Sequence, residues 1–175
     1  PFGTIPVVPE HFGQRQSIQL ELMRLLLQRV SHAQLDINGQ THARIGPGLL
    51  ALVGMEPHDT TEDLQYLVGK MLRLRIFGDE EGRMNLSVQD IQGECLIVSQ
   101  FTLMADTAKG NRPGYSKAAA PAVAEPLFLQ FLDLCREAWP NRVQSGVFGA
   151  DMQITLLNDG PVTIWMDSRD RSRSI

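Results

Sequence analysis

The sequence predicts a single α/β domain: a strand-rich mixed sheet in α/β/β, barrel-like layers, with two helices packed on one face. Three observations support this fold class. The chain has 175 residues, close to the roughly 150 residues of one domain. Segments with strand-like patterning outnumber helical ones, and both helical segments are long enough to cover one face of a sheet.

The composition is that of an ordinary folded protein, with 43% hydrophobic and 21% charged residues. No stretch reaches the roughly 18 consecutive apolar residues of a membrane span, so no membrane partner is expected. The net charge of -4 argues against coating of nucleic acid over the whole surface, and no DNA partner is expected. Cys95 and Cys135 lie in apolar surroundings and are predicted to be reduced core residues of a cytoplasmic protein.

The chain divides into three segments. Residues 1–22 lack clean periodicity and the features of a secretory signal, and are interpreted as an irregular N-terminal appendage. Regular patterning begins at Met23, so the domain is predicted to span residues 23–167. Residues 168–175 form a charged Ser/Arg tail that is expected to be disordered.

Strand signals dominate the first half of the domain. Residues 24–30 form a β-type run, and residues 33–37 alternate apolar with polar side chains. The Asn-Gly dipeptide at 38–39 suits a type I′ turn because both positions tolerate positive φ, and residues 41–45 are the predicted return strand. Residues 48–55 are nearly all apolar, which is typical of a strand buried on both faces.

Two segments have the periodicity of amphipathic helices. The first has candidate N-caps followed by an apolar stripe; the caps are Asp59, Thr60 and Thr61, and the stripe is Leu64, Leu67, Val68, Met71 and Leu72. The second helix is predicted over residues 122–138, with a stripe of Val123, Leu127, Phe131, Leu134 and Cys135.

One further strand-like run lies between the two helical segments, and two more follow the second. Residues 94–104 are predicted to form one strand, after a turn at 78–82. Residues 150–157 and 162–166 are predicted strands on either side of Asn-Asp-Gly-Pro at 158–161. Proline within a sheet requires an edge, a bulge or a turn. Since X-Pro bonds are cis in only about 5–6% of cases, these residues alone favour a trans turn.

The common catalytic motifs are absent from the sequence. It has no GxSxG, HExxH, P-loop or GxGxxG, and no cluster with metal-ligand spacing, so no metal and no cofactor is expected. The four histidines lie outside the segments with unusual chemistry; they are His11, His32, His42 and His58. A Ser-His-Asp enzyme is therefore weakly supported.

Two unusual segments and one charged loop remain. Polar residues at 99–103, with the sequence SQFTL, close an apolar strand, which marks either the rim of a site or merely a satisfied strand terminus. Residues 158–163, NDGPVT, form the second segment. The loop carries Lys109, Arg112 and Lys117, with Tyr115 among them and no acidic residue from 107 to 123. These three cations, here called the basic strip, either contact phosphates or are merely solvated.

Together these segments resemble the D-aminoacyl-tRNA deacylases, formerly called D-tyrosyl-tRNA deacylases. The resemblance runs from residue 23 to residue 166, in order and nearly without gaps. It rests on Gln28-Arg29-Val30, residues 45–50, residues 77–85, SQFTL, residues 112–117, residues 146–152 and NDGPVT. One departure is Gly114-Tyr115, which replaces the more familiar Ser-Phe of that loop.

The resemblance implies a homodimer that hydrolyses the ester between a D-amino acid and the terminal adenosine of tRNA, a proofreading step in translation. It also implies that the Gly160-Pro161 peptide is cis and enters the partner subunit's pocket, where it excludes L side chains. Arg29 is expected to brace this peptide, with Asn158 and Thr163 in support. An achiral glycyl ester is expected to be hydrolysed as well.

The implied chemistry requires little of the side chains. Backbone N–H groups near Phe101 and Thr102 are candidates for polarising the ester carbonyl, and Ser99 and Gln100 complete the candidate catalytic set. The neighbouring ribose hydroxyl of the tRNA is implied to assist the attack of water. Thr102 itself is expected to be a poor nucleophile, because no base adjoins it in the sequence.

Recognition of the RNA is implied to involve Phe148 and Met152, which match residues lining the adenosine pocket, and the basic strip. Two other functions stay open on the residues alone. One is a non-catalytic module that binds tRNA ends or D-amino acids. The other is an acyl hydrolase for small esters in which Thr102 is the nucleophile.

Overall fold

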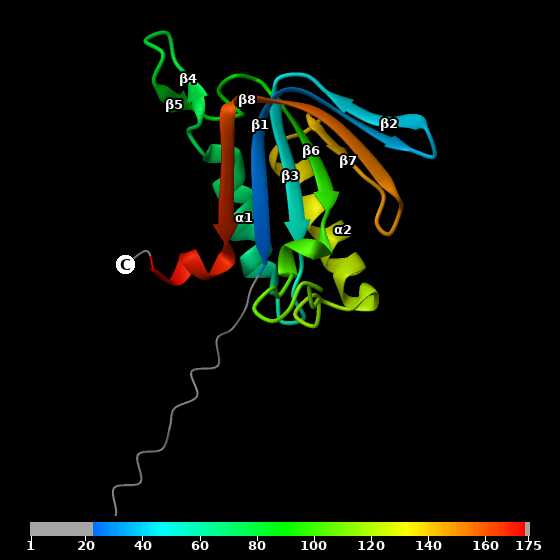
Figure 1. The fold of residues 1–175 in the computed structure, drawn as a ribbon. Helices are drawn as coiled ribbons and strands as arrows, with labels where there is room; N and C mark the ends of the chain where they lie inside the picture. Colours follow the sequence, from blue (N-terminus) through cyan, green and yellow to red (C-terminus); the bar gives the residue numbers. More distant parts are fainter. Residues whose placement is uncertain (1–22, 174–175) are drawn as a thin grey trace, which may run out of the picture.

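The computed structural model describes residues 23–173, and the predicted appendage at residues 1–22 lies outside them. Helices cover one face of a bent sheet (Figure 1). In chain order the elements are β1 (Arg24–Ile37), β2 (Gln40–Ile45), β3 (Gly48–Gly54), α1 (Thr61–Arg73), β4 (Phe77–Gly78), β5 (Met84–Leu86), β6 (Glu94–Ser99), the 3₁₀ helix η1 (Phe101–Met104), α2 (Pro121–Ala138), β7 (Val143–Ser145), β8 (Met152–Asp167) and the 3₁₀ helix η2 (Ser168–Arg173).

One six-stranded mixed sheet forms the centre of the fold. Its main order is β2-β1-β3-β6-β7, and β8 pairs with β1. β1 is antiparallel to β2, β3 and β8, whereas β6 runs parallel to both β3 and β7. Figure 1 shows β8 crossing the top of the sheet and then descending beside β1. The bent β1–β8 ribbon adds a third layer, and the predicted α/β/β, barrel-like class is confirmed.

β3 and β6 are buried on both faces because a separate apolar core lies on each side of them. Leu49 and Ala51 of β3 pack into the core beneath the helices, whereas Leu50 packs into the core enclosed by β1, β2 and β8. In β6, Cys95 and Leu96 divide between the two cores in the same way. Two-sided burial explains the continuous apolar run that predicted this strand, and that prediction is confirmed.

The first helix matches its prediction. α1 begins at Thr61 after the N-cap Thr60, whose N–H and hydroxyl both donate to the Asp63 carboxylate, at 3.0 and 2.8 Å. The predicted apolar stripe is buried throughout. Capping and periodicity agree here, so the sequence identifies both the start and the inward face of this helix.

The inward face of α2 differs from the predicted one. Its buried residues are Ala124, Phe128, Phe131, Leu132 and Cys135, whereas the predicted Val123 is exposed and Leu127 and Leu134 are half-buried. The prediction is thus confirmed for Phe131 and Cys135, and it lies one residue too early at Val123 and Leu127, which precede the buried Ala124 and Phe128. Apolar side chains occur on nearly all sides of α2, so periodicity alone does not select the face that packs.

Two strand predictions are wrong in their extent. The run predicted over residues 94–104 ends as a strand at Ser99, and η1 follows it. The runs on either side of residues 158–161 form one strand, β8, and the Gly160–Pro161 peptide between them is cis. Gln28 pairs with Thr163 and Val30 with Asn158, so Arg29 alone lies opposite residues 159–162. The segment is a bulge in an edge strand, where the missing N–H of proline is tolerated.

The prediction of a disordered tail is wrong for residues 168–173. These residues form η2, in which Ser168 is buried and its N–H donates to the Met23 carbonyl oxygen at 3.0 Å. Arg171 lies 3.7 Å from the Asp63 carboxylate. The segment is held because β8 delivers it beside the first residues of β1, where backbone groups are available.

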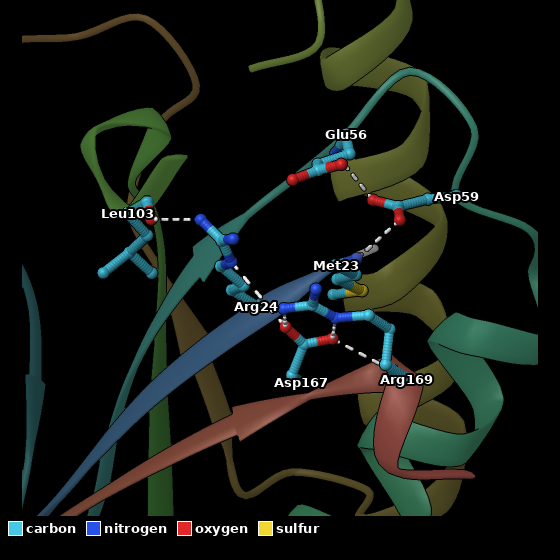
Figure 2. A network of polar contacts seen from close by, with 7 residues as sticks. All are labelled: Met23, Arg24, Glu56, Asp59, Leu103, Asp167 and Arg169. Carbon is cyan, nitrogen blue, oxygen red and sulfur yellow. Dashed lines mark hydrogen bonds and ion pairs between the residues drawn. The ribbon is translucent and has the colours of Figure 1, made fainter. Parts of the chain in front are cut away.

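A polar network joins the beginning of β1, the end of β8 and the loop before α1 (Figure 2). The Asp59 carboxylate accepts the N–H groups of Met23 and Glu56, at 2.6 and 2.7 Å. The pKa of Asp59 is raised to about 6, and burial is the largest cause; the nearby Asp63 and Asp167 carboxylates add to the rise, and the two hydrogen bonds oppose it. Asp59 is thus held partly buried beside other acidic groups.

This environment gives a prediction for the pH dependence of folding. Because the folded-state pKa of Asp59, about 6, exceeds its ordinary value of 3.8, the folded protein binds this proton more tightly than the unfolded chain does. Asp59 therefore contributes stability that increases as pH falls from about 6 towards 4. In urea unfolding, wild type should gain about 1–3 kcal/mol relative to Asp59→Asn between pH 7 and pH 4.

Asp133→Asn is the matched control, since the Asp133 side chain is 79% exposed. Wild type and this control should keep a nearly constant difference in unfolding free energy over the same range. A difference between wild type and Asp59→Asn that does not vary with pH would contradict the assignment.

Candidate active site

A cavity of about 680 Å³ opens where β3 and β6 end. Of the predicted site residues, Ser99, Gln100, Phe101, Phe148 and Met152 line it. The rest of the lining comes from the ends of β3 and β6, the residue that follows β3, the start of α2 and the segments around 115–120 and 149–154: Val53, Met55, Val98, Tyr115, Ala118, Ala119, Ala120, Pro121, Ala124, Gly149, Ala150, Asp151 and Ile154. The lining is mainly apolar, with few polar groups, as is usual in small-molecule sites.

The end of the parallel pairing brings Phe101, the first residue of η1, to this cavity. Val53 pairs with Ser99, and the Gln100 N–H then donates to the Val53 carbonyl oxygen at 2.7 Å. The chain turns directly into η1, which begins at Phe101. The first N–H groups of a helix have no acceptor within that helix. The Phe101 N–H is thus suited to bind an oxygen of a ligand in the cavity, and the Thr102 N–H follows it in the first turn of η1.

The Thr102 hydroxyl has a partner that is not a base. The Gln100 side-chain amide donates to Thr102 Oγ1 at 2.5 Å. Thr102 is not among the residues that line the cavity, and no histidine is among them. Among the lining residues the titratable side chains are Tyr115 and Asp151. The hydrogen bond from Gln100 to Thr102 therefore stabilises the first turn of η1. No histidine lines the adjoining cavity to deprotonate the Thr102 hydroxyl.

A side chain of β1, that of Arg24, holds η1 in its orientation through a hydrogen bond. Arg24 Nη1 donates to the Leu103 carbonyl oxygen at 3.0 Å, and Arg24 Nε lies 3.7 Å from the Asp167 carboxylate (Figure 2). Asp167 also accepts the Arg169 N–H at 3.0 Å. A Cβ on Gly54 would lie 2.9 Å from the Met104 side chain, so this glycine lets η1 pack directly on the end of β3.

Arg24 and Asp167 are site-supporting residues that the sequence reasoning missed. One signal was present: Arg24 is a cation at the start of the apolar run Leu25-Leu26-Leu27. A charged side chain in such a position requires a buried partner. The sequence does not show which carboxylate or carbonyl that partner is.

The loop between η1 and α2 forms one side of the cavity mouth. Phe101 and Tyr115 line the cavity and remain 58% and 40% exposed, with ring centroids 5.1 Å apart in an edge-to-face arrangement. Lys109 and Arg112 of the basic strip are exposed in this loop, and Lys117 is half-buried. None of the three lines the cavity itself. The base of the loop is closed by a backbone bridge between Asp106 and Gly114.

The second predicted segment lies at another position, the bulge of β8. Arg29 Nε donates to the Asp159 carbonyl oxygen at 3.1 Å and lies 3.2 Å from the Asp159 carboxylate. Arg29 Nη1 donates to the Ile76 carbonyl oxygen, which precedes β4. The side chains of Asn158 and Thr163 are hydrogen bonded to each other at 3.1 Å. Arg29 and this pair therefore hold the bulge at both ends.

Gly160 and Pro161 do not reach the first cavity of their own chain. They are exposed and line a separate cavity of about 500 Å³, together with Arg29 and parts of the β4–β5 hairpin. Three strand spacings separate β8 from β6 in the sheet, or about 14 Å. The Arg29 side of β8 and the Ser99 end of β6 are thus two sites within one chain.

Within residues 23–173, no helix is long and apolar enough to cross a membrane. The same part of the chain holds no group of three or more His, Cys, Asp or Glu side chains that could bind a metal ion.

Comparison with known proteins places these features in a family. A family model described as D-Tyr-tRNA(Tyr) deacylase matches residues 26–167. The D-aminoacyl-tRNA deacylase of Flavobacterium johnsoniae is 53% identical over 149 residues, which are 85% of this chain and 99% of that protein. The D-aminoacyl-tRNA deacylase of Akkermansia muciniphila is also 53% identical, with the same coverage.

Solved structures share the fold. One described as c-Myc DNA Unwinding Element Binding Protein has a TM-score of 0.79 and 40% identity, over 82% of this chain and 97% of that chain. One described as a probable eukaryotic D-amino acid tRNA deacylase has a TM-score of 0.72 and 21% identity, over 83% of this chain and 98% of that chain. The matched family model and the two bacterial relatives show that this chain belongs to the D-aminoacyl-tRNA deacylase family, a family of hydrolases.

Proposed function

We propose that this protein hydrolyses the ester of D-aminoacyl-tRNA, spares the L-aminoacyl ester, and works as a homodimer. The observation that carries the proposal is the cavity at the end of β6, where backbone donors of η1 meet an apolar recess. Family membership supports the reaction class. The cavity volume of about 680 Å³ is within the usual range for a site that takes one small molecule.

The apolar part of the cavity suits the terminal adenosine. Phe148 and Met152 line it, and Phe148 packs at 6.1 Å between ring centroids against Phe128 of α2, which holds the ring in place. A purine presents flat apolar faces that an aromatic ring and a methionine side chain contact well. The ester at the ribose then lies towards the strand end, near Ser99 and η1.

The reaction itself is a hydrolysis of an activated acyl group. Water adds to the ester carbonyl carbon, the N–H groups of Phe101 and Thr102 stabilise the oxyanion, and the bond between the carbonyl carbon and the ribose oxygen breaks. A good oxyanion donor contributes about 3–4 kcal/mol. The leaving ribose oxygen takes up a proton, and the neighbouring ribose hydroxyl of the substrate assists transfer of the proton from water. Ser99 and Gln100 orient the ester and η1.

Discrimination between mirror images requires exclusion by shape, because both enantiomers bury the same groups. The exposed Gly160–Pro161 bulge, held by Arg29, suits this purpose. In the proposed homodimer, the partner subunit's bulge enters the cavity, which accords with the position of the bulge outside the cavity of its own chain. There it occupies the space that an L side chain needs. A glycyl ester has no side chain and is not excluded.

The direct test is incubation of the protein with D-aminoacyl-, L-aminoacyl- and glycyl-tRNA. The D and glycyl esters should be hydrolysed at least about 100-fold faster than the L ester, since steric exclusion costs several kcal/mol. Loss of ester is followed by acid precipitation of labelled amino acid. Binding without hydrolysis would instead identify a non-catalytic module, and equal hydrolysis of both enantiomers would refute selection by shape.

The role of Thr102 is tested by Thr102→Ala. Because its hydroxyl is bonded to Gln100 and no base adjoins it, the variant should retain kcat/KM within about tenfold of wild type. Thr102→Val, which keeps the branched shape, serves as a control for packing of η1. Complete loss of activity in a folded Thr102→Ala protein, together with a trapped acyl-enzyme in wild type, would establish a threonine nucleophile.

The cross-subunit arrangement is tested by mixing two variants, neither of which hydrolyses the D ester selectively: the first has a disturbed bulge that no longer excludes the L ester, and the second has a filled cavity. Gly160→Ala disturbs the bulge, because the added Cβ would lie 2.5 Å from Arg29 Nη2 at a residue with φ of 118°. Ala120→Trp fills the cavity from an exposed position that lines it. In mixed dimers one site combines an intact cavity with an intact bulge.

When equal amounts of the two variants are refolded together, random pairing makes about half of the dimers mixed, and each mixed dimer has one intact site of two. D-specific hydrolysis should therefore return at about a quarter of all sites. Each variant refolded alone is the control. If the mixture shows no more selective activity than the average of the two variants, the bulge acts within its own chain.

A further inference from the structure

We propose that Phe101 and Tyr115 form a stacking platform for the unpaired nucleotide that precedes the terminal adenosine. This inference rests on the proposed function and extends it by one nucleotide of the RNA. It gives the cavity mouth a separate binding role, apart from the adenosine recess of Phe148 and Met152.

Phe101 and Tyr115 are two of the large hydrophobic side chains that are exposed within the described part of the chain. Their rings contact each other. Exposed apolar residues scattered singly are common, whereas a contacting aromatic pair at a cavity mouth indicates a binding surface. Both rings also line the cavity, so they lie where its wall meets the outer surface. Their planes are inclined at 69°. An edge-to-face pair leaves a ring face free for a third flat group.

The chemistry of the surrounding loop favours a nucleotide as this third group. From residue 107 to residue 123 the chain carries the basic strip and no acidic residue. Lys109 and Arg112 are exposed. Nearby acidic side chains are Asp106 at the base of the loop, whose carboxylate accepts the Ala108 N–H at 2.9 Å, and Asp151 on the cavity wall. An aromatic face beside cations on an otherwise acidic protein matches the stacking and phosphate contacts of single-stranded nucleic acid.

The position of the platform follows from the path of the RNA. If the terminal adenosine occupies the recess, its 5′ phosphate and the preceding nucleotide must leave through the mouth. A base stacked on the pair would place its phosphate towards the basic loop. In the sequence, Lys109 and Arg112 precede Tyr115 and Lys117 follows it. An apolar peptide or subunit face would pair with the rings alone, whereas a nucleotide pairs its base with the rings and its phosphate with the cations.

The experiment compares two small substrates that differ by one nucleotide: the D-phenylalanyl ester of adenosine and the D-phenylalanyl ester of cytidylyl-adenosine. For wild type, kcat/KM should be about 10-fold higher for the dinucleotide ester, as expected for one base stacked on an aromatic ring. Tyr115→Ala should lose most of this gain. Tyr115→Phe keeps the ring and should retain the gain. Leu129→Ala is the matched control, since Leu129 is 50% exposed on α2 and lies away from the cavity.

An undiminished gain in Tyr115→Ala would overturn the proposal. A fall in the kcat/KM of Tyr115→Ala with D-phenylalanyl-adenosine, but not with D-alanyl-adenosine, would also overturn it. Such a result would show that the ring contacts the acyl group. Conversion of Tyr115→Ala to monomers in sedimentation velocity would also overturn it, by showing a subunit contact.

A binding measurement separates failure of this proposal from failure of the proposed function. Calorimetric titration with uncharged cytidylyl-adenosine and with adenosine requires no hydrolysis. Wild type should bind the dinucleotide about 10-fold more tightly than adenosine, and Tyr115→Ala should bind both with similar affinity. If no ester is hydrolysed and this preference is present, the platform stands and the catalytic proposal fails. If esters are hydrolysed and the preference is absent, the reverse holds.

Discussion

Burial of both faces of β3 and β6 is the constraint on which the site depends. With a core on each side, these strands have no free face, and a ligand meets them only at an end. The end of β6 is where backbone pairing stops and η1 begins. Ligands of α/β proteins commonly bind at the carboxyl ends of strands for this reason. Arg24 then links η1 to β1 and β8, so the donors at Phe101 and Thr102 are fixed by the sheet itself.

A second constraint concerns the Gly160–Pro161 bulge. A surface that excludes one enantiomer must hold its shape against the incoming side chain. Arg29 ties the Asp159 carbonyl and carboxylate to the Ile76 carbonyl, and so joins the bulge to the segment that follows α1. Gly160 fits closely against Arg29, where any Cβ would collide. The bulge is therefore supported by two elements far apart in sequence, and it presents backbone atoms at an exposed edge.

The sequence predicted the parts of this fold in which local pattern and tertiary packing agree. The stripe of α1, the two-sided burial of residues 48–55 and the turn at 38–39 are examples, because cap, period and turn residues each indicate the same structure. It failed where several local patterns fit equally well. α2 is apolar on nearly every side, and only the sheet beneath decides that Phe128 faces inward. The end of β6 at Ser99 depends on the strand beside it, which no local signal reveals.

The candidate site shows the same division. SQFTL was identifiable because polar residues close an apolar strand, and NDGPVT because a proline lies between two strand-like runs. Phe148 and Met152 came from the family resemblance. The contribution of Arg24 was missed, since its partners Leu103 and Asp167 are 79 residues or more away in sequence. Placement of Gly160–Pro161 outside its own cavity likewise depends on strand order, which the sequence does not encode locally.

Few side chains that line the cavity could act as an acid, a base or a nucleophile. Its lining offers backbone N–H groups, a serine, an amide and flat apolar surfaces, with Asp151 as the one carboxylate and no histidine. Such a wall can orient an ester and stabilise an oxyanion, but it has little with which to deprotonate a strong nucleophile. An aminoacyl ester of adenosine brings its own hydroxyl next to the reacting bond. Under the proposed mechanism the protein supplies shape and hydrogen-bond donors and the substrate supplies the proton-transfer group, so the reaction needs no catalytic triad.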